Sequence, residues 1–136
     1  QLLIAAGEKL KYVQKDIELR GHAIECRINA EDAKTFMPSP GPVRLWHPPG
    51  GPGIRVDSHI YSGYNVPPNY DSLIAKVISY GDTRETAIAR MKNALAEMVV
   101  EGIRTNTALH QEIFNHAAFA QGGTDIHYLE RRLGIK

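Results

Sequence analysis

The sequence contains little cysteine, no long apolar run and almost no net charge. Its single cysteine, Cys26, cannot form a disulfide within the chain, and a buried free cysteine is typical of a reducing compartment. No signal peptide is visible, and no apolar run approaches the length of a membrane span. A formal charge of +1 gives no electrostatic basis for binding nucleic acid or an anionic membrane. We therefore expect a soluble cytoplasmic protein without nucleic-acid or membrane partners.

Common catalytic motifs are missing as well. The six histidines have no HExxH spacing and no cysteine pair to join, so the sequence predicts no metal site. There is no G-x-S-x-G elbow of a hydrolase. The segment 47–53 is rich in proline and glycine but lacks the Lys-Ser/Thr ending of a P-loop, which favours a tight connector. Glu31 and Asp32 are neighbours in a predicted turn, where we expect them to cap the turn or face solvent.

The strongest pattern present is the alternation in residues 21–32, GHAIECRINAED. Period-two alternation predicts a strand with one buried and one polar face. The expected buried face holds His22, Ile24, Cys26 and Ile28, and the expected polar face holds Ala23, Glu25, Arg27 and Asn29. Neighbours on one face stand about 7 Å apart, so a polar ligand could contact two of them. The pattern alone favours the simpler interpretation, an exposed strand face with a surface ion pair.

Further strands are predicted over 43–46, 54–59 and 70–80. The last has apolar side chains on both faces, so we expect it to be covered on both sides. Lys76 interrupts this pattern, and we interpret it as an edge lysine whose stem reaches towards solvent.

Helices are expected in the second half of the chain. Asp82 and Glu85 have capping-box spacing and predict a helix that runs to about Val100 and ends at Gly102. The helix at 106–116 would be capped by Thr105 or Asn106, and the one at 125–133 by Thr124 or Asp125.

The fold class is therefore α+β, in one domain over 1–136. A mostly antiparallel sheet at about residues 22–80 is followed by packing helices at about 82–100, 106–116 and 125–133. The start at Gln1 reads as the end of a helix closed by Gly7, so we expect a piece of a longer protein.

Polar residues remain on several of the predicted strands: Glu25, Arg27, Asn29, Arg55, Asp57 and Asp71. A site assembled from sheet residues could hold an anion or an oxyanion. The residues alone lead no further than a sheet domain with an arginine-centred polar face.

Six segments closely resemble the C-terminal domain of biotin carboxylases, in the same order along the chain. These are residues 21–32, 38–41, 70–74, 90–95, 101–106 and 123–130. The ending Leu133–Lys136 resembles that of the free-standing bacterial subunit of acetyl-CoA carboxylase, whereas a fused pyruvate or propionyl-CoA carboxylase would continue.

The resemblance implies an ATP-grasp ligase. Such an enzyme uses Mg-ATP and bicarbonate to make carboxyphosphate and then carboxylates the biotin of a biotin carboxyl carrier protein. This is the first half-reaction of acetyl-CoA carboxylase in fatty-acid biosynthesis. Most groups that bind ATP and Mg²⁺ would lie upstream of Gln1, so the isolated chain is expected to be inactive. The implied partners are the carrier protein, carboxyltransferase subunits and a second copy in a homodimer.

The resemblance also assigns roles to residues. Arg27 matches the arginine that engages the ureido oxygen of biotin and lies near bicarbonate. Asp71 matches an element beside the same pocket and would orient the substrate. Ile126 and His127 match the segment that packs against adenine.

Two residues bear on the expected homodimer. Arg55 matches a dimer-interface residue, and Pro52 stands where a well-known bacterial subunit has an aromatic interface residue. Two alternatives stay open: a non-catalytic dimerisation or carrier-docking module, and another ATP-grasp ligase with the same architecture. The GHAIECRINAED run argues against the second.

Overall fold

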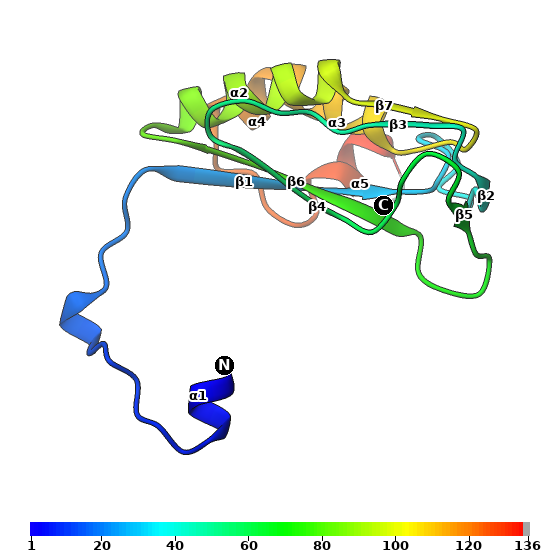
Figure 1. The fold of residues 1–136 in the computed structure, drawn as a ribbon. Helices are drawn as coiled ribbons and strands as arrows, with labels where there is room; N and C mark the ends of the chain where they lie inside the picture. Colours follow the sequence, from blue (N-terminus) through cyan, green and yellow to red (C-terminus); the bar gives the residue numbers. More distant parts are fainter. Residues whose placement is uncertain (135–136) are drawn as a thin grey trace.

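A three-stranded antiparallel sheet lies under a layer of helices in this computed structural model, which describes residues 1–134 (Figure 1). The strand order is β1–β6–β4, with bounds His22–Asn29, Leu73–Gly81 and Ile54–Ser58. The long helix α2, Arg84–Glu97, covers one face of this sheet. The α+β class with a mostly antiparallel sheet is confirmed.

Two smaller sheets extend this layer. The strands β2 and β5, Gly41–Pro42 and Asn65–Val66, pair antiparallel, as do β3 and β7, Leu45–His47 and Val99–Glu101. The remaining helices are α1 (Leu2–Ala5), the 3-10 helix η1 (Gln14–Asp16), α3 (Thr107–Asn115), α4 (Ala117–Gln121) and α5 (Tyr128–Leu133).

The predicted alternation of β1 is confirmed. Cys26 and Ile28 are buried on the helix side, and Arg27 between them is exposed. Burial raises the pKa of the Cys26 thiol to about 12, with a smaller contribution from the charge of Glu25. The thiol is therefore protonated at neutral pH and packs as a small apolar side chain.

The predicted two-sided burial of β6 is confirmed only in part. Ala75, Val77 and Ser79 are buried, and the Ser79 hydroxyl donates to the carbonyl of Ala87 in α2 at 2.9 Å. Of the residues expected on the other face, Ile74 is buried, Ile78 is half-buried and Tyr80 is 41% exposed. Lys76 also differs from its predicted setting, because it lies on the central strand and not on an edge.

Both ends of α2 differ from the predicted ones. Its N-cap is Thr83, whose hydroxyl accepts the Thr86 backbone N–H at 3.2 Å, so Asp82 lies one residue outside the cap. The helix stops at Glu97 because Met98 is extended and the next residues pair with β3. The β-branched pair Val99-Val100 suits that strand.

The starts of the later helices agree with the prediction only in part. Asn106 holds the N-cap position of α3 but makes no side-chain cap, and His127 instead of Thr124 or Asp125 holds that of α5. The short helix α4 was not predicted. Gly134 closes α5 in the left-handed conformation, as predicted, with φ +67°.

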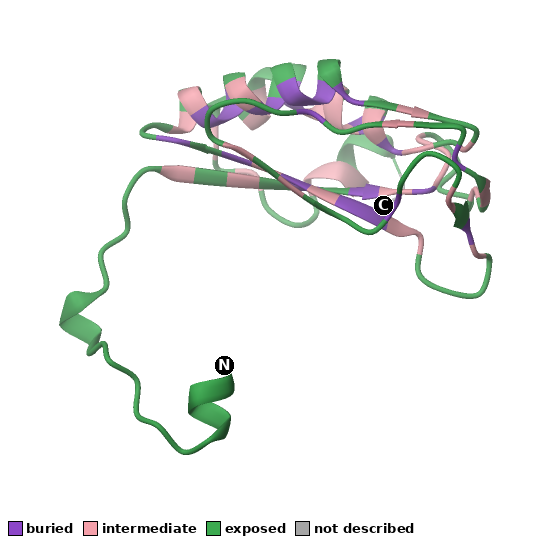
Figure 2. Ribbon diagram, viewed as in Figure 1, coloured by how far each residue is buried: buried purple, intermediate pink, exposed green. Residues whose placement is uncertain are grey.

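Residues 1–19 stand away from the sheet and from the later helices (Figure 1) and are exposed throughout (Figure 2). The predicted helix at the start is present as α1, and Gly7 follows it with φ +90°. Large apolar side chains project into solvent here, with Leu2 89% and Leu19 99% exposed.

Candidate functional site

The open face of the sheet gathers the polar residues that the sequence distributes over separate strands. Across the three strands, Arg27 stands opposite Lys76, and Lys76 opposite Asp57. One step along, Glu25 stands in the same row as Arg55, with Ile78 between them. Directly paired residues of an antiparallel sheet share a face, so these side chains form one polar surface.

Arg55 is occupied by a local ion pair. Its guanidinium donates two hydrogen bonds to Asp57, at 2.9 and 2.8 Å. These bonds lower the pKa of the Asp57 carboxyl, and the charges of Arg55 and Lys76 add to the effect. Both side chains remain exposed, so the pair contributes little to stability.

The Arg27 guanidinium forms no such ion pair with the described residues. The backbone carbonyl of Arg27 accepts two hydrogen bonds, but its guanidinium makes no hydrogen bond or ion pair with the described residues. The neighbour directly opposite is a second cation, Lys76, and like charges in that position repel. An anion, or an oxygen on which negative charge develops, would be stabilised between them. Sequence reasoning did not assign Lys76 to the site because strand order is not visible in the sequence.

Asp71 lies at the entrance of β6, beside a short polar network. The Ser72 hydroxyl donates to Glu31 and lies 3.4 Å from the Asp71 carboxylate. Glu31 also accepts from the Asn29 side-chain amide at 3.3 Å. This network joins the loop before β6 to the end of β1, two residues beyond Arg27. The roles of Glu31 and Ser72 were missed because the partners are far apart in the sequence.

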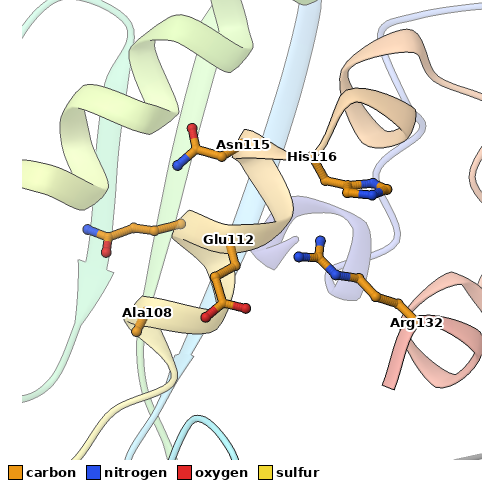
Figure 3. A pocket seen from close by; sticks show the side chains of 6 residues that line it. Ala108, Glu112, Asn115, His116 and Arg132 are labelled. Carbon is orange, nitrogen blue, oxygen red and sulfur yellow. The ribbon is translucent and has the colours of Figure 1, made fainter. Parts of the chain in front are cut away.

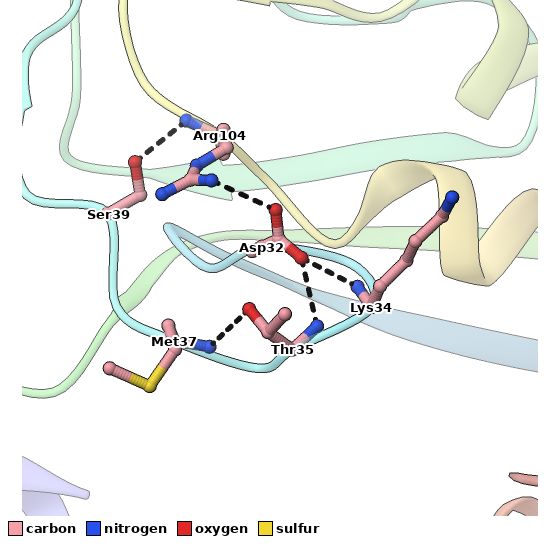
Figure 4. Close-up of polar contacts among 6 residues, drawn as sticks. All are labelled: Asp32, Lys34, Thr35, Met37, Ser39 and Arg104. Atoms are coloured by element: carbon pink, nitrogen blue, oxygen red, sulfur yellow. Dashed lines mark hydrogen bonds and ion pairs between the residues drawn. The ribbon is translucent and has the colours of Figure 1, made fainter.

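Asp32 behaves as the sequence predicted. Its carboxylate caps the turn by accepting the backbone N–H groups of Lys34 and Thr35, at 3.0 and 2.9 Å (Figure 4). It also pairs with Arg104 at 3.1 Å, and these partners together lower its pKa. The turn after β1 is thereby tied to the segment before α3.

Two open pockets lie along the same face. One of about 270 Å³ borders Asp57 and Lys76, and one of about 360 Å³ borders Tyr70 and Asp71. Their walls share His59, Leu73 and Ile74. Asp71 thus borders one of two adjoining pockets, and Lys76, which stands opposite Arg27, borders the other.

Ile126 and His127 lie elsewhere, in the loop before α5. Ile126 is 89% exposed, and the His127 ring lies 2.8 Å from the Glu130 carboxylate. Asp125 accepts the backbone N–H of His127 at 3.0 Å and pairs with Arg131 at 2.8 Å. The loop is therefore fixed by local contacts within residues 125–131, and the apolar side chain of Ile126 points to no described partner in the core.

A further pocket of about 460 Å³ lies between α3 and α5 (Figure 3). Its walls include Glu112, Asn115 and His116 of the α3 region and Arg132 of α5. The pocket is open to solvent, and none of the residues singled out in the sequence lies in it.

Among residues 1–134, no group of three His, Cys, Asp or Glu side chains is placed to hold a metal ion. Within the same residues, no helix is long and apolar enough to span a membrane. The chemistry on this surface is that of cationic side chains beside hydrogen-bonding groups.

Comparison with known proteins identifies this arrangement. The family model described as the biotin carboxylase C-terminal domain matches residues 25–131. The biotin carboxylase of Pseudomonas aeruginosa is 64% identical over 134 residues, which cover 98% of this chain and 30% of that protein. One of the pyruvate carboxylase subunits of Methanothermobacter thermautotrophicus is 47% identical over 137 residues, covering 99% of this chain and 28% of that protein.

A solved structure has the same fold. It is the biotin carboxylase domain dimer of Hydrogenobacter thermophilus 2-oxoglutarate carboxylase, in complex with MgADP, ADP and bicarbonate. It superposes with a TM-score of 0.93 at 44% identity, over 96% of this chain and 29% of that one. This chain thus spans about 30% of the length of the P. aeruginosa relative. With these matches over almost its whole length, the chain belongs to the biotin carboxylase C-terminal domain family.

Proposed function

We propose that this chain is the C-terminal part of a biotin carboxylase, which uses ATP and bicarbonate to carboxylate biotin on its carrier protein. The observation that carries this proposal is the unpaired guanidinium of Arg27 on the open sheet face, opposite Lys76. The reaction would be the first half-reaction of acetyl-CoA carboxylase in fatty-acid biosynthesis. The isolated chain would be inactive, because the rest of the site lies on the remaining part of the protein.

Arg27 would act on the biotin ring. When the ureido nitrogen becomes nucleophilic, negative charge moves onto the ureido oxygen. A fixed, permanently charged guanidinium stabilises that oxygen as the charge develops. Removing one such donor typically lowers kcat about 10²–10³-fold. Arg27→Lys would keep the charge but lose the planar pair of donors.

The remaining site residues have supporting roles in this proposal. Asp71, through Ser72 and the network at the end of β1, would orient the substrate beside Arg27. Ile126 would cover the adenine of ATP, because an exposed apolar side chain gains most by packing against a flat aromatic base. His127 would hold that loop in place through Glu130.

This chain offers binding residues for some ligands of the proposed reaction and not for others. The cationic pair of Arg27 and Lys76 suits a small anion such as bicarbonate. ATP supplies the phosphoryl group that activates bicarbonate, and Mg²⁺ balances the charge of its phosphates. We assign no Mg²⁺ ligand to this chain, because its described residues offer no suitable cluster.

The full protein is proposed to be a cytoplasmic homodimer that works with a carrier protein and carboxyltransferase subunits. The free, buried thiol of Cys26 is consistent with a reducing compartment. The exposed Arg55–Asp57 pair would lie at the dimer contact, with Pro52 in the neighbouring loop. Residues 1–136 would form one domain of the longer protein.

The 47% identity to a pyruvate carboxylase subunit leaves a second possibility for the molecule that finally receives the carboxyl group. In that case the same biotin chemistry would serve pyruvate and not acetyl-CoA. The acceptor belongs to a separate transferase reaction, so the role of Arg27 would be unchanged.

The experiment that tests the proposal uses the full-length protein with ATP, bicarbonate and free biotin. We expect ATP cleavage that depends on bicarbonate and is stimulated by biotin, together with carboxybiotin formation. Arg27→Lys should retain bicarbonate-dependent ATP cleavage and lose most of the carboxybiotin formation. A full-length protein that dimerises but neither cleaves ATP nor carboxylates biotin would instead be a non-catalytic module.

A further inference from the structure

The outer edge of β1 is bound by side chains of α3 at the position of Arg27. Because β1 is an edge strand, its groups on one side pair with β6 and those on the other side have no neighbouring strand. The Asn106 amide occupies that outer side. Its nitrogen donates to the Arg27 carbonyl at 3.1 Å, and its oxygen accepts the Asn29 N–H at 2.9 Å. The Asn106 backbone N–H also donates to the Asn29 carbonyl at 3.2 Å.

These partners fix the orientation of the amide. A backbone carbonyl can only accept and a backbone N–H can only donate, so the amide nitrogen must face Arg27 and the oxygen must face Asn29. Asn106 is only 7% exposed, and both ends of its amide are satisfied by the main chain of β1. A buried polar side chain in this arrangement is costly to leave without partners. Asn106 therefore substitutes for a neighbouring strand over these residues.

His110, one helical turn after Asn106, reinforces the same point. Its Nε2 lies 3.0 Å from the Arg27 carbonyl and must carry the proton, since the carbonyl only accepts. Burial lowers the pKa of His110, so the ring is neutral at pH 7. The carbonyl of Arg27 thus receives two side-chain donors from α3.

The inner side of β1 is less regular at this place. Arg27 and Ile28 pair regularly with Lys76 and Ala75, but Asn29 pairs with Leu73, so an extra residue of β6 lies in between. Such a bulge bends the strand that carries the extra residue, here β6, and interrupts the ladder locally. The regular ladder therefore ends one residue after Arg27, and Asn106 and His110 hold the outer side of β1 at this point.

We propose that Asn106, supported by His110, is a positioning residue that sets the direction of the Arg27 guanidinium by holding its main chain. This inference rests on the proposed function, in which Arg27 stabilises the biotin oxyanion. Asn106 itself faces the buried outer edge of β1 and contacts no reacting atom. A displacement of about 1 Å at a catalytic group can cost about 10²-fold in rate.

The test uses the full-length enzyme with Asn106→Asp. This nearly isosteric change keeps an acceptor for the Asn29 N–H but turns a carboxylate oxygen towards the Arg27 carbonyl. We expect kcat for biotin carboxylation to fall about 10- to 10²-fold. Bicarbonate-dependent ATP cleavage without biotin, and KM for ATP, should stay within about twofold, a change worth only about 0.4 kcal/mol. Asn115→Ala is the matched control, because Asn115 is an exposed amide at the end of the same helix.

His110 provides a second route if Asn106→Asp does not fold. His110→Leu removes one donor to the Arg27 carbonyl and should lower biotin carboxylation more than ATP cleavage. His110→Gln restores an N–H donor on a side chain of similar reach and should recover most of the lost rate.

A double-mutant comparison separates this inference from the proposed function. In an Arg27→Ala background, Asn106→Asp should cause no further loss of the residual biotin carboxylation, because its effect passes through Arg27. Parallel loss of both activities in Asn106→Asp and His110→Leu, or an undiminished effect without Arg27, would overturn the positioning role alone. If Arg27→Ala by itself leaves biotin carboxylation intact, the proposed function fails, and this inference with it.

Discussion

Arg27 and Ile126 are both proposed to contact substrates, yet they are supported very differently. The main chain at Arg27 is held by β6 on one side and by Asn106 and His110 on the other, over a buried core. Ile126 is 89% exposed in a loop fixed by local contacts. The comparison indicates that this chain by itself holds the main chain of the proposed biotin-contacting residue in place. The adenine side would be completed by the rest of the full protein.

The largest expected difference between the two regions is in stability. Ile28 is fully buried beneath Arg27, so Ile28→Ala should lower the free energy of unfolding by about 2–5 kcal/mol. Ile126→Ala removes an exposed side chain and should change it by no more than about 0.5 kcal/mol. Urea unfolding of the chain measures both. Ile28→Val, expected to cost about 0.5–1.5 kcal/mol, is the graded control. Equal costs at 28 and 126 would show that Ile126 is packed, and the contrast would be lost.

A glycine pair sharpens the same contrast in the backbone. Gly102 and Gly123 both have positive φ, +100° and +76°. A Cβ at Gly102 would collide with the carbonyl oxygen of Pro42, whereas a Cβ at Gly123 meets nothing within 4 Å. Gly102→Ala should therefore cost about 1–3 kcal/mol more than Gly123→Ala, because both share the strain of positive φ but only one is overpacked. Thermal unfolding of the two variants gives the difference, and similar melting temperatures would count against the close packing at Gly102.

Helix capping is the next effect in size. Thr83→Ala removes the hydroxyl that accepts the Thr86 N–H and should destabilise the chain by about 1 kcal/mol. Asp82→Ala and Thr124→Ala should each cost less than about 0.5 kcal/mol, because neither residue caps a helix. A larger loss from Asp82→Ala than from Thr83→Ala would restore the capping assignment made from the sequence.

The smallest expected effect is on pH dependence. The pKa of Asp32 is lowered in the folded chain, first by the turn N–H groups and then by Arg104. A depressed carboxyl pKa stabilises the fold above the unfolded value of about 4, and this contribution is lost as pH falls through the folded pKa. The free energy of unfolding should therefore fall less between pH 7 and pH 3 in Asp32→Asn than in the parent chain. The control is Asp82→Asn, at an exposed carboxylate without a hydrogen bond in the described chain. If Asp32→Asn left the pH dependence unchanged, the Asp32 carboxylate would not contribute to the pH dependence of stability.

The local patterns were predictable from the sequence. Alternation of apolar Cys26 and Ile28 with polar Arg27 identifies the faces of β1, because strand side chains alternate whatever the neighbours are. Adjacent residues Asp82 and Thr83 are both good N-caps, and only the extended backbone of Thr83 decides between them. The end of α2 was placed too late, since Val99 and Val100 join a strand whose partner lies more than fifty residues earlier.

The support around the site was not predictable in this way. Asn106 and His110 reach Arg27 across 79 and 83 residues of sequence, and a helix cap was the natural interpretation of Asn106. Lys76 was placed at an edge because the order β1–β6–β4 cannot be read from one chain. The roles of Arg27, Asp71, Ile126, His127 and Arg55 came from the family resemblance and remain predictions.

The most direct test of the account is the ratio of two activities in full-length Arg27→Ala. Carboxybiotin formation and biotin-independent, bicarbonate-dependent ATP cleavage are measured on the same preparation. The account predicts that the first falls at least about 10²-fold while the second is largely kept, because Arg27 acts on the biotin oxyanion and not on ATP. Equal loss of both activities, or undiminished carboxybiotin formation, would contradict it.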